Sequence, residues 1–170
     1  GSVFLGQDAG QNDDLNASDN VGIGSYALSA NTTGYLNTAL GKSALASNIS
    51  GSYNVAVGND ALADLMTTGN NTAIGSFAGA NATGTANVFV GYGAGENEAG
   101  NDKLYIHNSN SASPLIWGDF VNRYLNINGY LGIGTTSPAQ KLDVVGTMKT
   151  VGFQMPTGAG AGLVLQSDAS

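Results

Sequence analysis

A short motif of hydrophobic positions recurs six times in the first hundred residues of the chain. Each copy has three small or strand-forming residues followed by Gly, as in Val55-Ala56-Val57-Gly58. An Ala comes three residues after each motif Gly, and the next residue is Leu or Gly. The motif glycines are 18, 17, 17, 17 and 16 residues apart, which predicts an all-β solenoid with one coil for each copy. The copies are Val3–Gly6, Val21–Gly24, Thr38–Gly41, Val55–Gly58, Thr72–Gly75 and Val88–Gly91.

Alternation within each motif predicts the two faces of its strand. Side chains of a strand point to opposite faces in turn, so Val55 and Val57 share one face and Ala56 lies on the other. The β-branched and aliphatic face suits the inside of a coil. The opposite face would then carry a column of mostly small residues that a second chain could approach closely. These candidates for a trimer axis are Phe4, Gly22, Ala39, Ala56, Ala73 and Phe89.

A second set of glycines predicts where each coil turns. Thr33-Gly34, Ser50-Gly51, Thr68-Gly69 and Thr83-Gly84 recur between the motifs. Gly can supply the positive φ that several tight turns need, so we expect such turns here. A coil of about 17 residues makes a circuit of roughly 56 Å, and six coils about 4.8 Å apart give a height of roughly 29 Å.

The repeat resembles the head repeat of trimeric autotransporter adhesins. In the last five copies an Asn precedes the motif, which then reads Asn-Val/Thr-x-Ile/Val/Leu-Gly-x-x-Ala; these residues are Asn20, Asn37, Asn54, Asn71 and Asn87. The resemblance covers residues 2–100 and implies a left-handed parallel β-roll that assembles as a homotrimer. The coils here are a few residues longer than the compact repeat of that family.

The pattern changes after residue 101. Strand-like runs are expected at 103–108, 115–120 and 123–133. Hydrophobic and polar residues alternate in the first and third runs, so each of these should have one buried face. Gly129 and Gly132 interrupt the third run and predict a hairpin or a bulge. This part of the sequence is expected to form a small β domain.

The segment Gly132–Gly146, which contains Thr135-Thr136-Ser137-Pro138, resembles a part of phage tail fibres and related bacterial fibres. In those proteins it precedes a stalk and a self-cleaving chaperone domain. We therefore expect a fragment of a longer fibre with three parts: solenoid repeats at 1–101, a small, β-prism-like domain at 102–136 and a neck at 137–170.

Composition restricts the partners. Of 170 residues 42% are hydrophobic and only 10% are charged, against roughly 25% charged in ordinary proteins, so the chain should fold. The formal net charge is −7, and Lys42 is the only basic residue before position 103. Nucleic acid and anionic membranes are therefore poor partners. With no cysteine there is no disulfide or thiol chemistry, and no cofactor is expected.

Candidate ligand-binding residues gather at 103–130. Sugars favour an aromatic platform beside carboxylate, amide or guanidinium groups, and Trp117, Asp119 and Arg123 offer these types. The other candidates are Tyr105, His107, Tyr124 and Tyr130. The alternative is that the aromatic residues form core or trimer interface, with Asp119 and Arg123 as an ordinary ion pair.

Catalysis and metal binding have weak support in the sequence. His107 is the only histidine, and no Gly-x-Ser-x-Gly motif is present, so neither a transition-metal site nor an enzyme is expected. The acidic pairs Asp13-Asp14 and Glu96/Glu98 could hold Ca²⁺ but fit solvated loops better.

The leading functional hypothesis is an extracellular fibre head on a phage or a bacterial surface that binds a target-cell glycan or another envelope component. A purely structural spacer is the alternative. A glycan-cleaving β-helix and an ice-binding solenoid rank behind, because paired carboxylates and a regular Thr column are missing from the repeats.

Overall fold

The computed structural model describes residues 1–14 and 18–149. These residues form eleven strands, and no helix occurs among them. The chain divides into two compact units, residues 1–129 and 130–170. The strands of the first unit are β1 Val3–Leu5, β2 Val21–Ile23, β3 Thr38–Leu40, β4 Val55–Val57, β5 Thr72–Ile74, β6 Val88–Val90, β7 Lys103–Ile106, β8 Ile116–Asp119 and β9 Tyr124–Ile127; those of the second are β10 Leu131–Ile133 and β11 Leu142–Val144.

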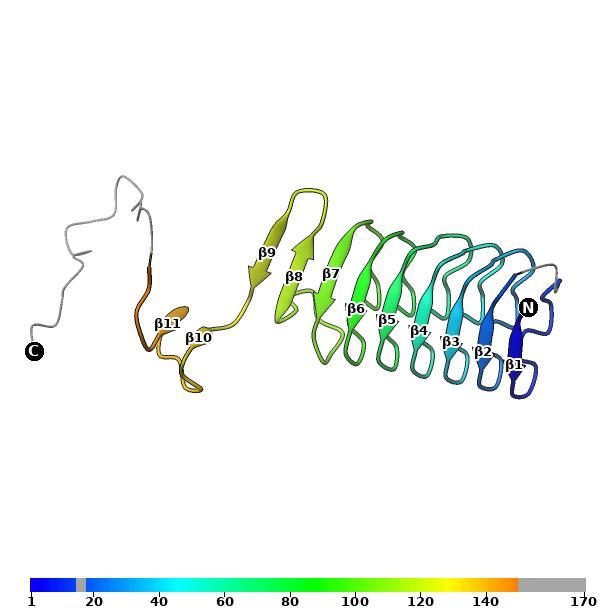
Figure 1. The fold of residues 1–170 in the computed structure, drawn as a ribbon, viewed down its shortest axis with the longest axis horizontal. Coiled ribbons are helices and arrows are strands. Elements are labelled where there is room, and N and C mark those ends of the chain that lie inside the picture. Colours follow the sequence, from blue (N-terminus) through cyan, green and yellow to red (C-terminus); the bar gives the residue numbers. More distant parts are fainter. Residues whose placement is uncertain (15–17, 150–170) are drawn as a thin grey trace, which may run out of the picture. The chain divides into compact units, whose positions relative to one another are not determined.

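The first unit is a parallel β-solenoid of about six turns. Strands β1 to β9 form one sheet in chain order, parallel from β1 to β7 and antiparallel at β7–β8 and β8–β9 (Figure 1). The motif positions are in register from coil to coil, as in Ala39 beside Ala56 and Ala56 beside Ala73. The predicted solenoid is therefore confirmed at this level, while the left-handed sense of the coil stays a prediction.

The two faces of these strands are the reverse of the sequence prediction. Ala39, Ala56 and Ala73 have no exposed surface, whereas Leu40 and Ile74 are 46% exposed. The reason is that the inside of the coil is narrow. In the middle coils the Ala and Leu that follow the motif Gly already partly fill it, so only a small strand residue fits there. The proposed trimer-axis residues therefore point into the core of their own chain. Phe89 is fully buried, Gly22 is buried, and Phe4 is partly buried against the same core.

Side-chain volumes compensate across this narrow core. Where the strand residue is Ala39 or Ala56, the residue after the conserved Ala is Leu45 or Leu62, and both leucines are fully buried. Phe89 instead packs against glycines: a Cβ at Gly79 would lie 2.6 Å from its Cδ2, and one at Gly95 would lie 2.2 Å from its Cδ1. Phe4 has the same relation to Gly10. The choice between Leu and Gly in the repeat therefore follows the size of the strand residue it meets.

A ladder of buried asparagines lines one edge of the solenoid. The backbone N–H before each of β3 to β6 donates to the side-chain oxygen of the Asn one coil earlier, at 2.8–3.0 Å, and the Asn Nδ2 donates to a turn carbonyl. Asn54 illustrates the unit, with its Oδ1 accepting from Asn71 N and its Nδ2 donating to the carbonyl of Thr68. Asp13 accepts from the Nδ2 of both Asn20 and Asn31 at the first coil. These bonds explain why Asn recurs: its side chain completes the backbone hydrogen bonding where each strand begins.

The predicted role of the second glycine set is wrong. Gly34, Gly51, Gly69 and Gly84 do not have positive φ. They are needed because a neighbouring coil passes too close for a Cβ, which at Gly51 would lie 2.2 Å from the carbonyl oxygen of Thr68. Positive φ occurs at the motif glycines, for example 144° at Gly41, and at Leu45 and Leu62 in the following turn.

The C-terminal strands differ in part from their prediction. The first two predicted runs contain β7 and β8, and both join the solenoid sheet. The third run forms two separate strands: β9 pairs with β8, and β10 pairs in parallel with β11 rather than folding back on β9. Strand β9 has no buried face of the kind predicted, since Tyr124 and Leu125 are each 65% exposed. A β-prism-like arrangement stays a prediction, and most of the predicted neck lies outside the described residues.

Candidate functional site

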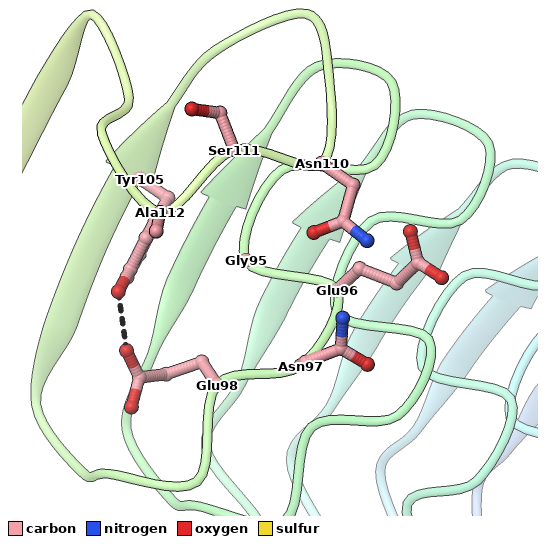
Figure 2. A pocket seen from close by; sticks show the side chains of 8 residues that line it. All are labelled: Gly95, Glu96, Asn97, Glu98, Tyr105, Asn110, Ser111 and Ala112. Atoms are coloured by element: carbon pink, nitrogen blue, oxygen red, sulfur yellow. Dashed lines mark hydrogen bonds between the residues drawn. The ribbon is translucent and has the colours of Figure 1, made fainter.

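The last complete coil ends in a polar cavity. After β7 the chain leaves the path of the solenoid and returns antiparallel as β8, so no further coil covers the turn that follows β6. The space left there has a volume of about 270 Å³ and lies between this turn and the β7–β8 loop (Figure 2). Its walls are formed by Gly95, Glu96, Asn97, Glu98, Tyr105, Asn110, Ser111 and Ala112.

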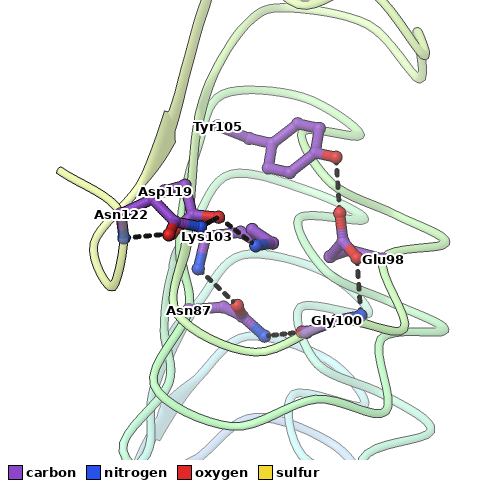
Figure 3. A network of polar contacts seen from close by, with 7 residues as sticks. All are labelled: Asn87, Glu98, Gly100, Lys103, Tyr105, Asp119 and Asn122. Atoms are coloured by element: carbon purple, nitrogen blue, oxygen red, sulfur yellow. Dashed lines mark hydrogen bonds and ion pairs between the residues drawn. The ribbon is translucent and has the colours of Figure 1, made fainter. Parts of the chain in front are cut away.

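Tyr105 and Glu98 form one wall of the cavity. The Tyr105 hydroxyl donates a 2.5 Å hydrogen bond to Glu98 Oε2, and Glu98 Oε1 accepts from the backbone N–H of Gly100 at 2.6 Å (Figures 2 and 3). Burial of the phenol, followed by the neighbouring Glu98 carboxylate, raises the pKa of Tyr105 to about 12. Tyr105 is therefore a neutral donor at physiological pH, with its ring half-buried beside Phe89.

A second polar network lies beside this wall (Figure 3). Lys103 Nζ is 2.8 Å from Asp119 Oδ2, and Asp119 also accepts from the backbone and side-chain nitrogens of Asn122 at 2.8 and 3.0 Å. The hydrogen bond from the Asn122 backbone, with Lys103 next, holds the pKa of Asp119 well below its usual range. The backbone N–H of Lys103 donates to Asn87 Oδ1, which joins this network to the Asn ladder. These contacts fix β8 on the end of the solenoid.

The structure brings some of the predicted ligand residues together. Tyr105 and Trp117 are directly paired across β7–β8, and Lys103 Nζ lies 5.7 Å from the centroid of the Trp117 ring. The carboxylate of Asp119 is buried and engaged by Lys103 and Asn122, so its ion pair is with Lys103 and not with Arg123 as the sequence suggested. The Asp119 carboxylate is thus held by contacts within the chain, and the roles predicted for Tyr105 and Trp117 as ligand residues stay predictions.

The other predicted residues lie apart from the cavity wall. His107 Nδ1 accepts from the backbone N–H of Leu115, and Tyr124 is mostly exposed on β9. Arg123 precedes β9 with a φ of 58°. Tyr130 belongs to the second compact unit, where Lys141 Nζ lies 5.1 Å from its ring centroid.

Sequence reasoning missed Asn97, Asn110 and Ser111 and considered Glu96 and Glu98 only as Ca²⁺ ligands. The end of the repeat in the sequence could have indicated this site, because no further coil covers the last one. Within residues 1–14 and 18–149, no group of three or more His, Cys, Asp or Glu residues is arranged to hold a metal ion.

Comparisons with protein-family models, with curated proteins and with solved structures give no match to this chain. In the part of the chain that the structure describes, no helix has the length and apolar character needed to cross a membrane. The β-solenoid architecture itself is typical of structural and adhesive proteins.

Proposed function

We propose that this chain is a homotrimeric segment of an extracellular fibre that contacts glycans on a target surface. The observation that carries the proposal is the outer face of the nine-stranded sheet, called here the outer strip. The outer strip consists of Val3, Leu5, Val21, Ile23, Thr38, Leu40, Val55, Val57, Thr72, Ile74, Val88, Val90, Leu104, Ile106, Ile116, Gly118, Leu125 and Ile127.

The outer strip has no charged residue, and its only polar side chains are Thr38 and Thr72. Nine strands about 4.8 Å apart make it about 38 Å long. Parallel sheets are ordinarily covered on both faces, and soluble monomers rarely expose a continuous apolar patch of this extent. Here the coil covers only the inner face, and Leu5 on the outer strip is 67% exposed. This exposed apolar face supports the proposal that a partner covers it.

A second and third copy of the chain are the partners that fit best. Net charge −7 makes copies repel one another, and the outer strip is where they can meet without facing charges. Three such strips around one axis would bury each other, which agrees with the trimer implied by the sequence resemblance. The outer strip therefore replaces the column of small residues as the proposed contact surface between chains. The trimer itself stays a proposal.

Charge placed on the outer strip tests this assembly. Leu40→Glu should dissociate the trimer, because three carboxylates would have to be buried near one another. Ile49→Glu is the matched control, since Ile49 is equally exposed, at 44% against 46%, but lies in a turn outside the strip. Sedimentation velocity of both variants should give a monomer for the first and an unchanged trimer for the second. Unchanged sedimentation of both would contradict this interface.

Adhesion and a purely structural role share this fold. A polar cavity at the end of the solenoid favours adhesion, because a spacer has no need of an open site. Trimerisation would place three copies of that site on one particle and raise avidity without new contacts. Binding of the trimer to an array of surface glycans distinguishes the two roles.

A further inference from the structure

The open end of the last coil carries backbone donors that the earlier coils use for stacking. In each earlier coil the residue after the conserved Ala donates its N–H to the next coil, as in Leu45 to Ala61, Leu62 to Ala78 and Gly79 to Ala94, all at 3.0 Å. A second row two residues later behaves alike, ending with Asn81 to Glu96 at 2.8 Å. Both rows point toward the C-terminal end of the solenoid.

The next donors in these two rows are the N–H groups of Gly95 and Asn97. Neither has an acceptor among the residues that the structure describes, because the chain departs after β7 and supplies no further coil. Both residues line the cavity. The site therefore presents two N–H donors, two residues apart in the same coil, that are available to an oxygen acceptor.

The other groups around the cavity limit what that acceptor can be. The Glu96 carboxylate has no partner within the described residues, and Glu98 adds a second negative charge, so an anionic ligand is disfavoured. Glu96, Asn97, Asn110 and Ser111 offer the carboxylate, amide and hydroxyl groups that bind sugar hydroxyls (Figure 2). The Tyr105 ring supplies an apolar surface at one side.

Size and closure favour a small ligand over a peptide strand. The volume of about 270 Å³ is just below the usual range for small-molecule sites, which begins at roughly 300 Å³. The segment Asn110–Ala112 also borders the cavity opposite the turn and would block an extended chain that followed the coil. A single sugar ring with a neutral carbonyl substituent meets both limits.

We propose that this cavity binds an N-acetylated, uncharged amino sugar, with the acetamido oxygen accepting from the N–H groups of Gly95 and Asn97. The acetamido N–H and the ring hydroxyls then face Glu96, Asn97, Asn110 and Ser111, and the apolar side of the ring faces Tyr105. The proposal rests on the glycan-binding role given above and assigns its site and ligand class.

The test is saturation-transfer NMR on the full chain with N-acetylglucosamine and N-acetylgalactosamine as probes. Glucose and galactose lack the acetamido group, and N-acetylneuraminic acid adds a negative charge. We expect saturation of the acetamido methyl of the first two sugars, and at least tenfold weaker effects with the other three. Amide resonances of Gly95 and Asn97 should shift with the same ligands.

Two neighbouring loop residues provide the variants. Ala112 lines the cavity and Ser113 does not, and both are exposed, so Ala112→Trp should abolish binding while Ser113→Trp retains it. Equal thermal midpoints of the two variants exclude misfolding as the cause. Equal binding of glucose, loss in both variants, or binding of an N-acetylated dipeptide amide in place of the sugars would overturn the proposal. If the chain is a trimer but binds none of the sugars, the proposed site is refuted and the proposed assembly stands. If the chain is a monomer that binds the N-acetylated sugars, the assembly is refuted and the site stands.

Discussion

Replacing Phe89 and Gly79 together should reveal the size compensation inside the solenoid. Phe89 is fully buried, and Phe89→Ala should lower the free energy of unfolding by about 3–5 kcal/mol through lost burial and a cavity. Gly79→Leu alone should also destabilise, because its Cβ would lie 2.6 Å from Phe89 Cδ2 and 2.8 Å from Leu62 Cδ2. Overpacking of this kind costs about 1–3 kcal/mol.

The chain with both Phe89→Ala and Gly79→Leu should be more stable than the sum of the two single effects predicts. It restores at this level the Ala and Leu combination already present at Ala73 and Leu62, where the Leu also lies one coil before the Ala. Leu can adopt the required backbone, since Gly79 has a φ of 58° and Leu62 has one of 50°. We expect the double substitution to recover about 2 kcal/mol relative to the sum of the single ones, within the range found for residues in contact.

Denaturant unfolding followed by circular dichroism, at one protein concentration for all four chains, measures this coupling. The concentration must be fixed because assembly contributes to the apparent stability. Additive effects of the two substitutions, or a stable Gly79→Leu chain, would refute the compensation. Either result would mean that Leu or Gly at this position is chosen for the turn and not for the core.

Three further perturbations test the polar parts of the structure. Asn54→Ala should destabilise by about 2–4 kcal/mol because it leaves buried backbone groups without partners, whereas Asn81→Ala on the exposed surface should change the denaturation midpoint little. The raised pKa of Tyr105 contributes stability that is complete below pH 10 and is lost as pH rises toward 12, so thermal midpoints of wild type and Tyr105→Phe should converge over that range. The lowered pKa of Asp119 has the opposite sign: its contribution is present above about pH 4 and is lost on acidification, so Asp119→Asn should lose less stability between pH 4 and pH 2 than wild type does.

The repeat predicted the fold because it encodes register directly. Motif spacing places Ala39, Ala56 and Ala73 side by side, and no distant contact is needed to obtain that result. The repeat did not predict whether those residues point into the coil or out of it. Alternation separates the two faces of a strand but does not say which face is inside. The deciding fact is the narrow interior, which depends on how the turn bearing Leu45 and Leu62 packs against the strand.

The candidate site was predicted less well than the fold. Tyr105 was named from its residue type, but the cavity depends on where the chain leaves the coil, and the sequence marks that point only by the end of the repeat. The ion-pair partner of Asp119 was not predicted, because Lys103, sixteen residues away, reaches it across the β7–β8 pair. Such partners are set by strand pairing after the last coil, which no repeat specifies.

The molar mass of the intact chain in solution tests the central claim most directly. Light scattering after size exclusion should give about three times 17.0 kDa, because the outer strip must be covered and copies of the chain are its proposed cover. A mass of 17.0 kDa across the measured concentrations would contradict the account and leave the apolar face of the sheet exposed to water.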